Sequence, residues 1–143
     1  MAKKELFDNP ITRAVCTLYN CVPVDRNDVG PSTLKAINRV LKRGDALLMF
    51  PEGTRSKDGV MGAIKSGIGM IAVRNEVDIL PVATTGLFEA KGRMFSRPEV
   101  VVRYGELIAV KSFQNGSAKK SIYASIAKAL ENKLQFLAAS TAQ

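Results

Sequence analysis

The sequence predicts a single α/β domain, residues 1–143, with a mixed and partly parallel sheet flanked by helices. A chain of 143 residues is the usual size of one domain and can bury a hydrophobic core. Its 46% hydrophobic and 24% charged residues are typical of a globular protein. Strand-like runs alternate with helical patterns along the chain, and this order favours parallel strand pairs.

The chain begins with an amphipathic helix and a short strand. Ile11, Val15 and Leu18 recur at helical spacing, which predicts a helix over residues 10–19. Apolar residues 22–24 then predict a brief strand.

The next two elements are a helix and a continuous apolar run. Pro31 suits the first turn of a helix, and Gly44 suits the position just after its end. The run 46–50 is flanked by polar and proline residues, which is typical of a strand covered on both faces.

The second half of the chain starts with a polar, glycine-bearing loop over residues 51–62. A third helix is predicted over 66–75, and two strands rich in β-branched residues over 79–83 and 100–104. A long amphipathic helix over about 119–138 completes the domain.

Several classes of site are excluded by residue types. The chain has no histidine, so it holds no Ser/His/Asp or Cys/His relay. Cys16 and Cys21 are too few for a structural zinc site within one chain, and we expect both to be ordinary reduced cysteines. The G-x-G-x-x-A pattern of residues 67–72 does not directly follow a strand, so it indicates close helix packing and not a dinucleotide site.

The formal net charge of +8 favours polyanions, anionic lipid headgroups or phosphorylated small molecules. Nucleic acid is not expected, because the basic residues are scattered and the three tyrosines form no stacking set. The charged start of the chain is unlike a signal peptide, and no apolar run reaches membrane-spanning length. We therefore expect a cytoplasmic protein in peripheral contact with the inner face of the membrane, through Lys3, Lys4 and Arg13 beside the first helix.

The segment Phe50-Pro51-Glu52-Gly53-Thr54-Arg55-Ser56 is the strongest candidate for chemistry. It leaves the end of a predicted buried strand, where ligands gather in α/β sheets. Arg55 offers a planar fork of donors suited to phosphate, and Gly53 lets backbone N–H groups approach a ligand. The alternative is a capped turn with a solvated ion pair.

A second segment, Val24-Asp25-Arg26, follows another predicted strand. By itself it is a surface acid and arginine after an edge strand. Together with Arg55 it predicts two arginines that converge on one phosphate, with Lys65 as a third positive charge.

These residues together resemble the glycerolipid acyltransferase family, whose type enzymes convert lysophosphatidate to phosphatidate. Residues 50–56 match the third family motif in full, and Val24-Asp25-Arg26 matches the core of the second. Ile79-Leu80-Pro81-Val82 looks like the fourth, and Lys65 falls where the family often has a basic residue. The resemblance covers about residues 2–107.

The resemblance implies that Arg26 and Arg55 bind the substrate phosphate. It also implies that Glu52 and Gly53 shape the glycerol site, with Thr54 and Lys65 in the same substrate-binding set. The acyl donor would be acyl-CoA or acyl-carrier protein, the acceptor a lysophospholipid such as 1-acylglycerol-3-phosphate, and no cofactor would be bound. Candidate linings for an acyl groove are Met49, Met61, Met70 and Leu87.

The chain departs from the family at its start. The first family motif, a His and an Asp separated by four residues, would lie just upstream of residues 1–6, and the chain has no histidine. In the family that His is the general base. We therefore expect a fold truncated at its N-terminal side, inactive alone, with an exposed sheet edge that favours self-association. The alternative is a non-catalytic binding module for phosphorylated or anionic lipids.

Overall fold

The computed structural model describes residues 1–24, 30–54, 56, 59–88, 99–114 and 118–140. These residues form two compact units, Met1–Phe50 and Pro51–Gln143, and each is described by itself. The expectation of one domain over the whole chain stays a prediction.

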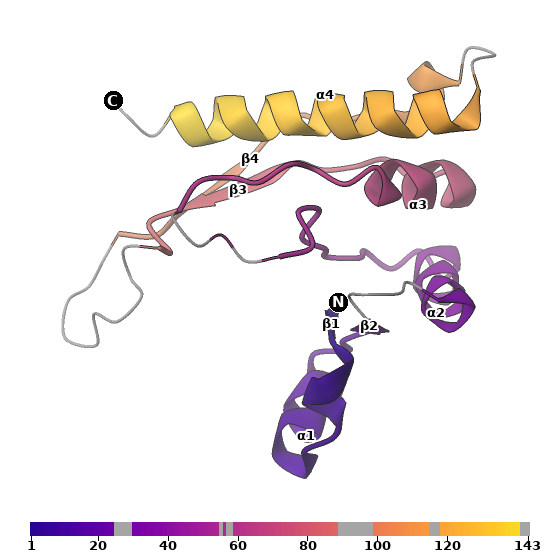
Figure 1. Ribbon diagram of the computed structural model, residues 1–143, viewed down its shortest axis with the longest axis vertical. Helices are drawn as coiled ribbons and strands as arrows, with labels where there is room; N and C mark the ends of the chain where they lie inside the picture. The colour runs from indigo at the N-terminus through magenta and orange to yellow at the C-terminus, as the bar shows by residue number, and fades with distance from the viewer. Residues whose placement is uncertain (25–29, 55, 57–58, 89–98, 115–117, 141–143) are drawn as a thin grey trace. The chain divides into compact units, whose positions relative to one another are not determined.

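The first unit contains a short parallel strand pair and two helices (Figure 1). Strands β1 (Ala2–Lys3) and β2 (Pro23–Val24) are parallel, with Ala2 opposite Pro23. Between them lie a 3₁₀ turn, η1 (Lys4–Phe7), and helix α1 (Pro10–Leu18). The prediction of the first helix and the brief strand is confirmed.

Local sequence explains where the helices of this unit begin and end. The Asn9 side chain caps α1 by accepting the N–H groups of Ile11 and Thr12. Helix α2 (Pro31–Lys42) has its proline in the first turn. Gly44 follows it with a φ of 82°, a conformation that glycine adopts without strain.

The prediction of a buried strand over residues 46–50 is wrong. The segment has no strand hydrogen-bonding pattern, and the Leu48 and Phe50 side chains are 70% and 73% exposed. The Leu48 carbonyl accepts a hydrogen bond from the Met1 ammonium at 3.1 Å, and not from a neighbouring strand. A continuous apolar run becomes a central strand only where neighbours pair with it, and in the described part of the chain none does.

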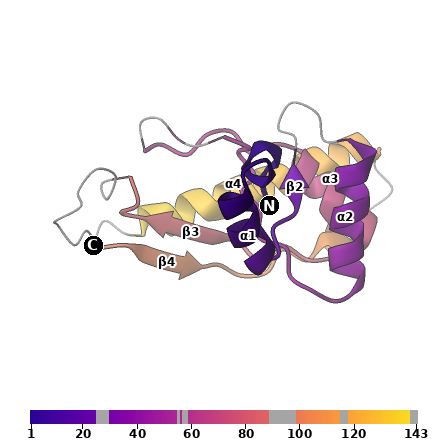
Figure 2. The same ribbon diagram turned by 90° about the horizontal axis from the view of Figure 1, so that it is seen from below.

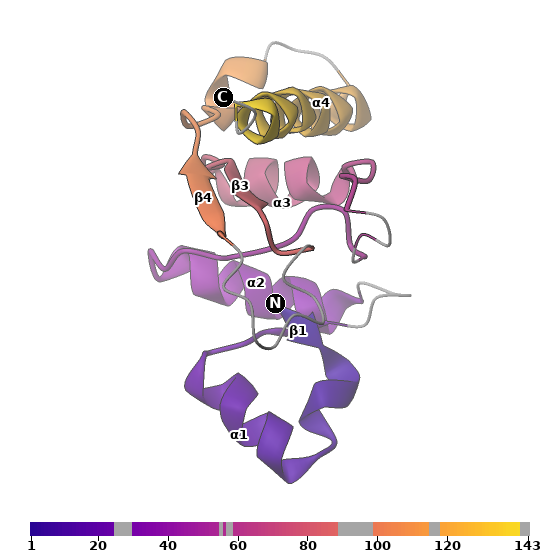
Figure 3. The same cartoon turned by 90° about the vertical axis from the view of Figure 1, so that its left-hand side faces the viewer.

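The second unit packs two helices and an antiparallel strand pair around one core. Helix α3 (Gly67–Asn75) lies along helix α4 (Lys119–Ala139), as Figures 1 and 3 show. Strand β3 (Val82–Thr85) runs antiparallel to β4 (Val101–Tyr104), visible in Figure 2, and the 3₁₀ turn η2 (Val110–Phe113) precedes α4. The centre of the core is made by Ala72, Val110, Ile122 and Ile126.

The strand predicted over 79–83 forms three residues later than expected. Ile79 makes only a single bridge, to Ile108, and the regular ladder starts at Val82. Pro81 separates the two because it has no N–H to donate to a ladder. The remaining elements of this unit match their predicted positions, and the predicted fold class, a mixed α/β fold, is confirmed by one parallel and one antiparallel pair.

None of the described helices is both long and apolar enough to cross a membrane.

Close packing of α3 on α4 explains one of the glycines of the G-x-G-x-x-A pattern. A Cβ atom at Gly69 would lie 2.5 Å from the Tyr123 carbonyl oxygen and 2.8 Å from its Cα. Both atoms belong to a helix backbone, which cannot move aside without shifting α4. The expectation that these glycines serve helix packing is confirmed at Gly69, whereas a Cβ at Gly67 would meet nothing within 4 Å.

We expect Gly69→Ala to lower the free energy of unfolding by about 1 to 3 kcal/mol, because the added methyl group overpacks this contact. Urea unfolding followed by circular dichroism measures the change. Gly67→Ala is the matched control, and it should not destabilise the protein, since the site is open and alanine favours a helix. Equal unfolding midpoints for Gly69→Ala and the unmodified chain would contradict the packing argument.

Candidate functional site

The loop of residues 51–65 contains most of the strongest sequence motif, residues 50–56. The Lys65 backbone N–H donates to the Pro51 carbonyl at 3.1 Å, which holds the ends of the loop together. Inside it, the Gly62 N–H donates to Oε2 of Glu52 at 2.6 Å. Glu52 is half-buried, and its carboxylate therefore serves as a brace across the loop.

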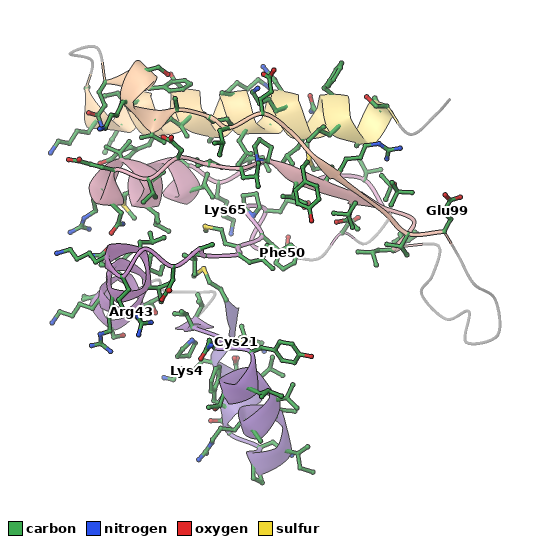
Figure 4. The ribbon with its side chains drawn as sticks, turned by 180° about the vertical axis from the view of Figure 1, so that it is seen from behind. Lys4, Cys21, Arg43, Phe50, Lys65 and Glu99 are labelled. Carbon is green, nitrogen blue, oxygen red and sulfur yellow. The ribbon has the colours of Figure 1, made fainter. Side chains whose placement is uncertain are left out.

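Gly53 lets the Lys65 side chain lie against the loop backbone. Its φ of 72° is in the left-handed region that favours glycine. A Cβ atom at this position would lie 2.9 Å from the Lys65 Nζ and 3.2 Å from its Cε. The missing side chain of Gly53 thus makes room for a lysine twelve residues later, and Figure 4 shows Lys65 beside this loop.

A second turn follows within the same loop. The Gly59 N–H donates to the Ser56 hydroxyl oxygen at 2.7 Å, and Gly59 has a φ of 84°. A Cβ atom at Gly59 would lie 3.1 Å from the Phe88 ring, so the aromatic side chain lies close beside this glycine. Phe88 was missed by the sequence reasoning. It follows β3, and the rule that ligands gather at the carboxyl ends of strands is the signal that would have pointed to it.

The structure brings together three of the six predicted substrate-binding residues. Glu52, Gly53 and Lys65 meet in the loop, and Thr54 is exposed within it. Arg26 and Arg55 lie outside the described residues, as does Asp25. Their convergence on one phosphate stays a prediction.

This arrangement can hold an anion, and among the described residues of the loop its one carboxylate is that of Glu52. A lysine ammonium beside a glycine backbone is a favourable neighbour for a phosphate or carboxylate. One oxygen of the Glu52 carboxylate already accepts the Gly62 N–H. In the described residues, no three His, Cys, Asp or Glu side chains gather as metal ligands.

The predicted linings of an acyl groove are divided between the two units. Met61 and Met70 are half-buried in the second unit, where Leu87 is 57% exposed, and Met49 is half-buried in the first unit. Their role in holding an acyl chain stays a prediction.

The two cysteines are free thiols, as expected. The Cys21 N–H donates to the Cys16 carbonyl at 2.8 Å, just after α1. Burial raises the pKa of the Cys16 thiol, and the neighbouring Cys21 thiol raises it further. Cys16 is therefore a protonated and weakly reactive thiol at neutral pH.

Comparison with known proteins shows that the chain is similar to acyltransferases. The family model described as Acyltransferase matches residues 1–85. A 1-acyl-sn-glycerol-3-phosphate acyltransferase of Bacillus subtilis is 32% identical, over 96% of this chain and 70% of its own length. The protein of the same name from Streptococcus pneumoniae is 36% identical, over 80% of this chain and 42% of its own length.

One solved structure is similar in fold and sequence. It is the crystal structure of the 1-acyl-sn-glycerophosphate (LPA) acyltransferase PlsC from Thermotoga maritima. The TM-score is 0.66 and the sequence identity 30%, and the match covers 92% of this chain and 54% of the other. The chain thus spans about half the length of this relative.

Proposed function

Because the chain belongs to the acyltransferase family, we propose that it acts in phospholipid biosynthesis by binding a lysophospholipid such as 1-acylglycerol-3-phosphate as the acyl acceptor. The relatives named for this activity support the acceptor class. The acyl donor proposed is acyl-CoA or acyl-carrier protein.

The observation that carries this proposal is the Lys65 ammonium beside Gly53 in the loop of the third family motif. A phosphate bound there would meet one cation and an open stretch of backbone. By resemblance to the family, Arg26 and Arg55 would add two guanidinium groups, and Glu52 would border the glycerol moiety. Glu52 can keep its position because the Gly62 N–H holds its carboxylate.

The reaction of the family places limits on what this chain can do alone. A glycerol hydroxyl must lose its proton while its oxygen forms a bond to the thioester carbonyl carbon, and the thiol then leaves. The chain has no histidine to accept that proton. We propose that residues 1–143 bind and orient the acceptor, with little turnover of their own.

The same absence of histidine favours a second candidate, a binding module for phosphorylated or anionic lipids. The two candidates share the phosphate site and differ only in whether a proton acceptor completes it. A measurement of acceptor binding therefore tests what they have in common.

Isothermal titration calorimetry with a soluble short-chain lysophosphatidate is the test of the proposed function. We expect binding that requires the phosphate, so a monoacylglycerol of the same chain length should bind at least about tenfold more weakly, since it makes no charge-assisted contacts. Inorganic phosphate should compete. Equal affinity for the two lipids would contradict the assignment of this loop as a phosphate site.

A further inference from the structure

Helix α1 turns an apolar stripe away from the residues of its own unit that it packs against. Ile11, Val15 and Leu18 lie on one face at helical spacing, and Tyr19 follows at the end of the helix. Their side chains are 75%, 51%, 78% and 75% exposed, in that order. An amphipathic helix that only stabilised the fold would bury this face, so the orientation requires another explanation.

The opposite side of α1 is the one that contacts the rest of its unit, and it is the more polar side. The Thr12 hydroxyl donates to the Leu6 carbonyl, and Nε of Arg13 donates to the Phe7 carbonyl at 2.7 Å. Cys16 is the buried residue of the helix. These hydrogen bonds to η1 fix the rotation of α1 about its axis, and therefore keep the apolar stripe outward.

Helix α2, in the same unit, carries a cationic stripe. Lys35, Arg39 and Lys42 are spaced by four and three residues, so they share one face, and all three are exposed. The helix contains no acidic residue. Arg43, labelled in Figure 4, follows it and pairs with Asp45 at 3.2 Å.

We propose that the apolar stripe of α1 inserts into the surface of an anionic lipid bilayer, and that the cationic stripe of α2 supplies the electrostatic attraction. Apolar and aromatic side chains on one helix face, with cations nearby, are the requirements for binding at a membrane interface. An acidic protein partner would use the cations but leaves the apolar stripe unexplained. The choice of lipid also rests on the proposed function, whose acceptor is a membrane lipid.

The proposed membrane contact differs from the one expected from the sequence, which was made by Lys3, Lys4 and Arg13. Lys3 pairs with Glu5 at 2.9 Å, and the Arg13 side chain is held at the Phe7 carbonyl. Lys4 is exposed (Figure 4). The α2 stripe is the larger group of cations in this unit that lie together on one helix face.

The test is sedimentation with vesicles of phosphatidylcholine containing about 30% phosphatidylglycerol, without lysophosphatidate. We expect binding that weakens as salt is raised and that is lost on pure phosphatidylcholine. Ile11→Ser combined with Leu18→Ser should lower the partition coefficient about tenfold or more. Lys35→Gln, Arg39→Gln and Lys42→Gln together should lower it by about fivefold per charge at low salt.

Matched variants in the second unit separate these stripes from general effects of charge and hydrophobicity. Phe136→Ser with Leu107→Ser removes two exposed apolar side chains, at 73% and 62% exposure. A second control removes three exposed lysines, Lys111, Lys119 and Lys120, by change to Gln. We expect both controls to bind vesicles within about twofold of the unmodified chain, because neither removes a residue of the two stripes.

Loss of binding in the control variants equal to that in the stripe variants would overturn the proposal. So would vesicle binding unaffected by the stripe variants. A dimer in sedimentation velocity that Ile11→Ser with Leu18→Ser dissociates, without vesicle binding, would instead assign the stripe to a second copy of the chain. Circular dichroism of each variant must match the unmodified chain.

Binding of soluble short-chain lysophosphatidate, measured without vesicles, distinguishes this proposal from the proposed function. If the chain binds that lipid but no vesicles, the docking surface is wrong and the phosphate site stands. If vesicle binding depends on both stripes but the soluble lipid does not bind, the proposed function is wrong and the docking surface stands.

Discussion

Residues 1–143 are expected to transfer acyl groups from palmitoyl-CoA to lysophosphatidate about 10²- to 10⁴-fold more slowly than a version that carries a His-x4-Asp motif upstream of residue 1, because a general base contributes a factor of this size. The measurement is thiol release from the thioester with lysophosphatidate as acceptor. An acyl-carrier-protein thioester, used in parallel, tests the second proposed donor.

The groups that remain in the chain are poor substitutes for a histidine. A carboxylate near its usual pKa is a weak base for an alcohol, and an ordinary lysine is protonated at neutral pH. Glu52 already accepts the Gly62 N–H at 2.6 Å, so one of its oxygens is committed to the loop. Cys16 is no alternative nucleophile, because burial and the Cys21 thiol raise the pKa of its own thiol.

Comparable rates for the two versions would show that the base lies within residues 1–143 and that this account of the mechanism is wrong. The necessary control is binding of short-chain lysophosphatidate to both versions. If both versions bind the lipid, a slow rate reflects the missing proton acceptor and not a failure to bind the acceptor lipid.

The helices could be predicted from the sequence because their signals are local. In α4, Ile122, Ile126, Leu130 and Leu134 repeat with the helical period, and all four are buried. In α1 the periodicity predicts the helix, but it does not tell whether the apolar face is buried or exposed. Periodicity shows that one face is apolar, whereas the hydrogen bonds of Thr12 and Arg13 to η1 decide that this face points outward.

Strands were harder to predict, since a strand depends on its neighbours. Residues 46–50 have the composition of a buried strand, yet Leu48 and Phe50 are exposed, because pairing partners and not composition make a central strand. The candidate site, too, could be predicted only in part, because its contacts depend on how the chain folds. The motif itself is continuous in sequence, but the contacts of Glu52 with Gly62 and of Gly53 with Lys65 arise only when the loop closes.

Alanine at either motif arginine is expected to weaken lysophosphatidate binding about ten- to hundredfold, since each change removes a charge-assisted contact worth about 1.5 to 3 kcal/mol. The variants are Arg26→Ala and Arg55→Ala, measured by calorimetry with the short-chain lipid. Lys65→Ala should have a smaller effect of about three- to tenfold, because an exposed ammonium is a point charge without the bidentate geometry of arginine.

Two further variants make this prediction specific to the phosphate site. Arg55→Lys keeps the charge but loses the planar fork, so it should recover only part of the affinity. Lys111→Ala removes an exposed cation outside the loop and should bind like the unmodified chain. Unchanged affinity in both arginine variants would reject the phosphate site, whereas a loss in Arg55→Ala alone would reject only the role of Arg26. A full loss in Arg55→Lys with none in Lys111→Ala would show that hydrogen-bond geometry, more than net charge, holds the phosphate.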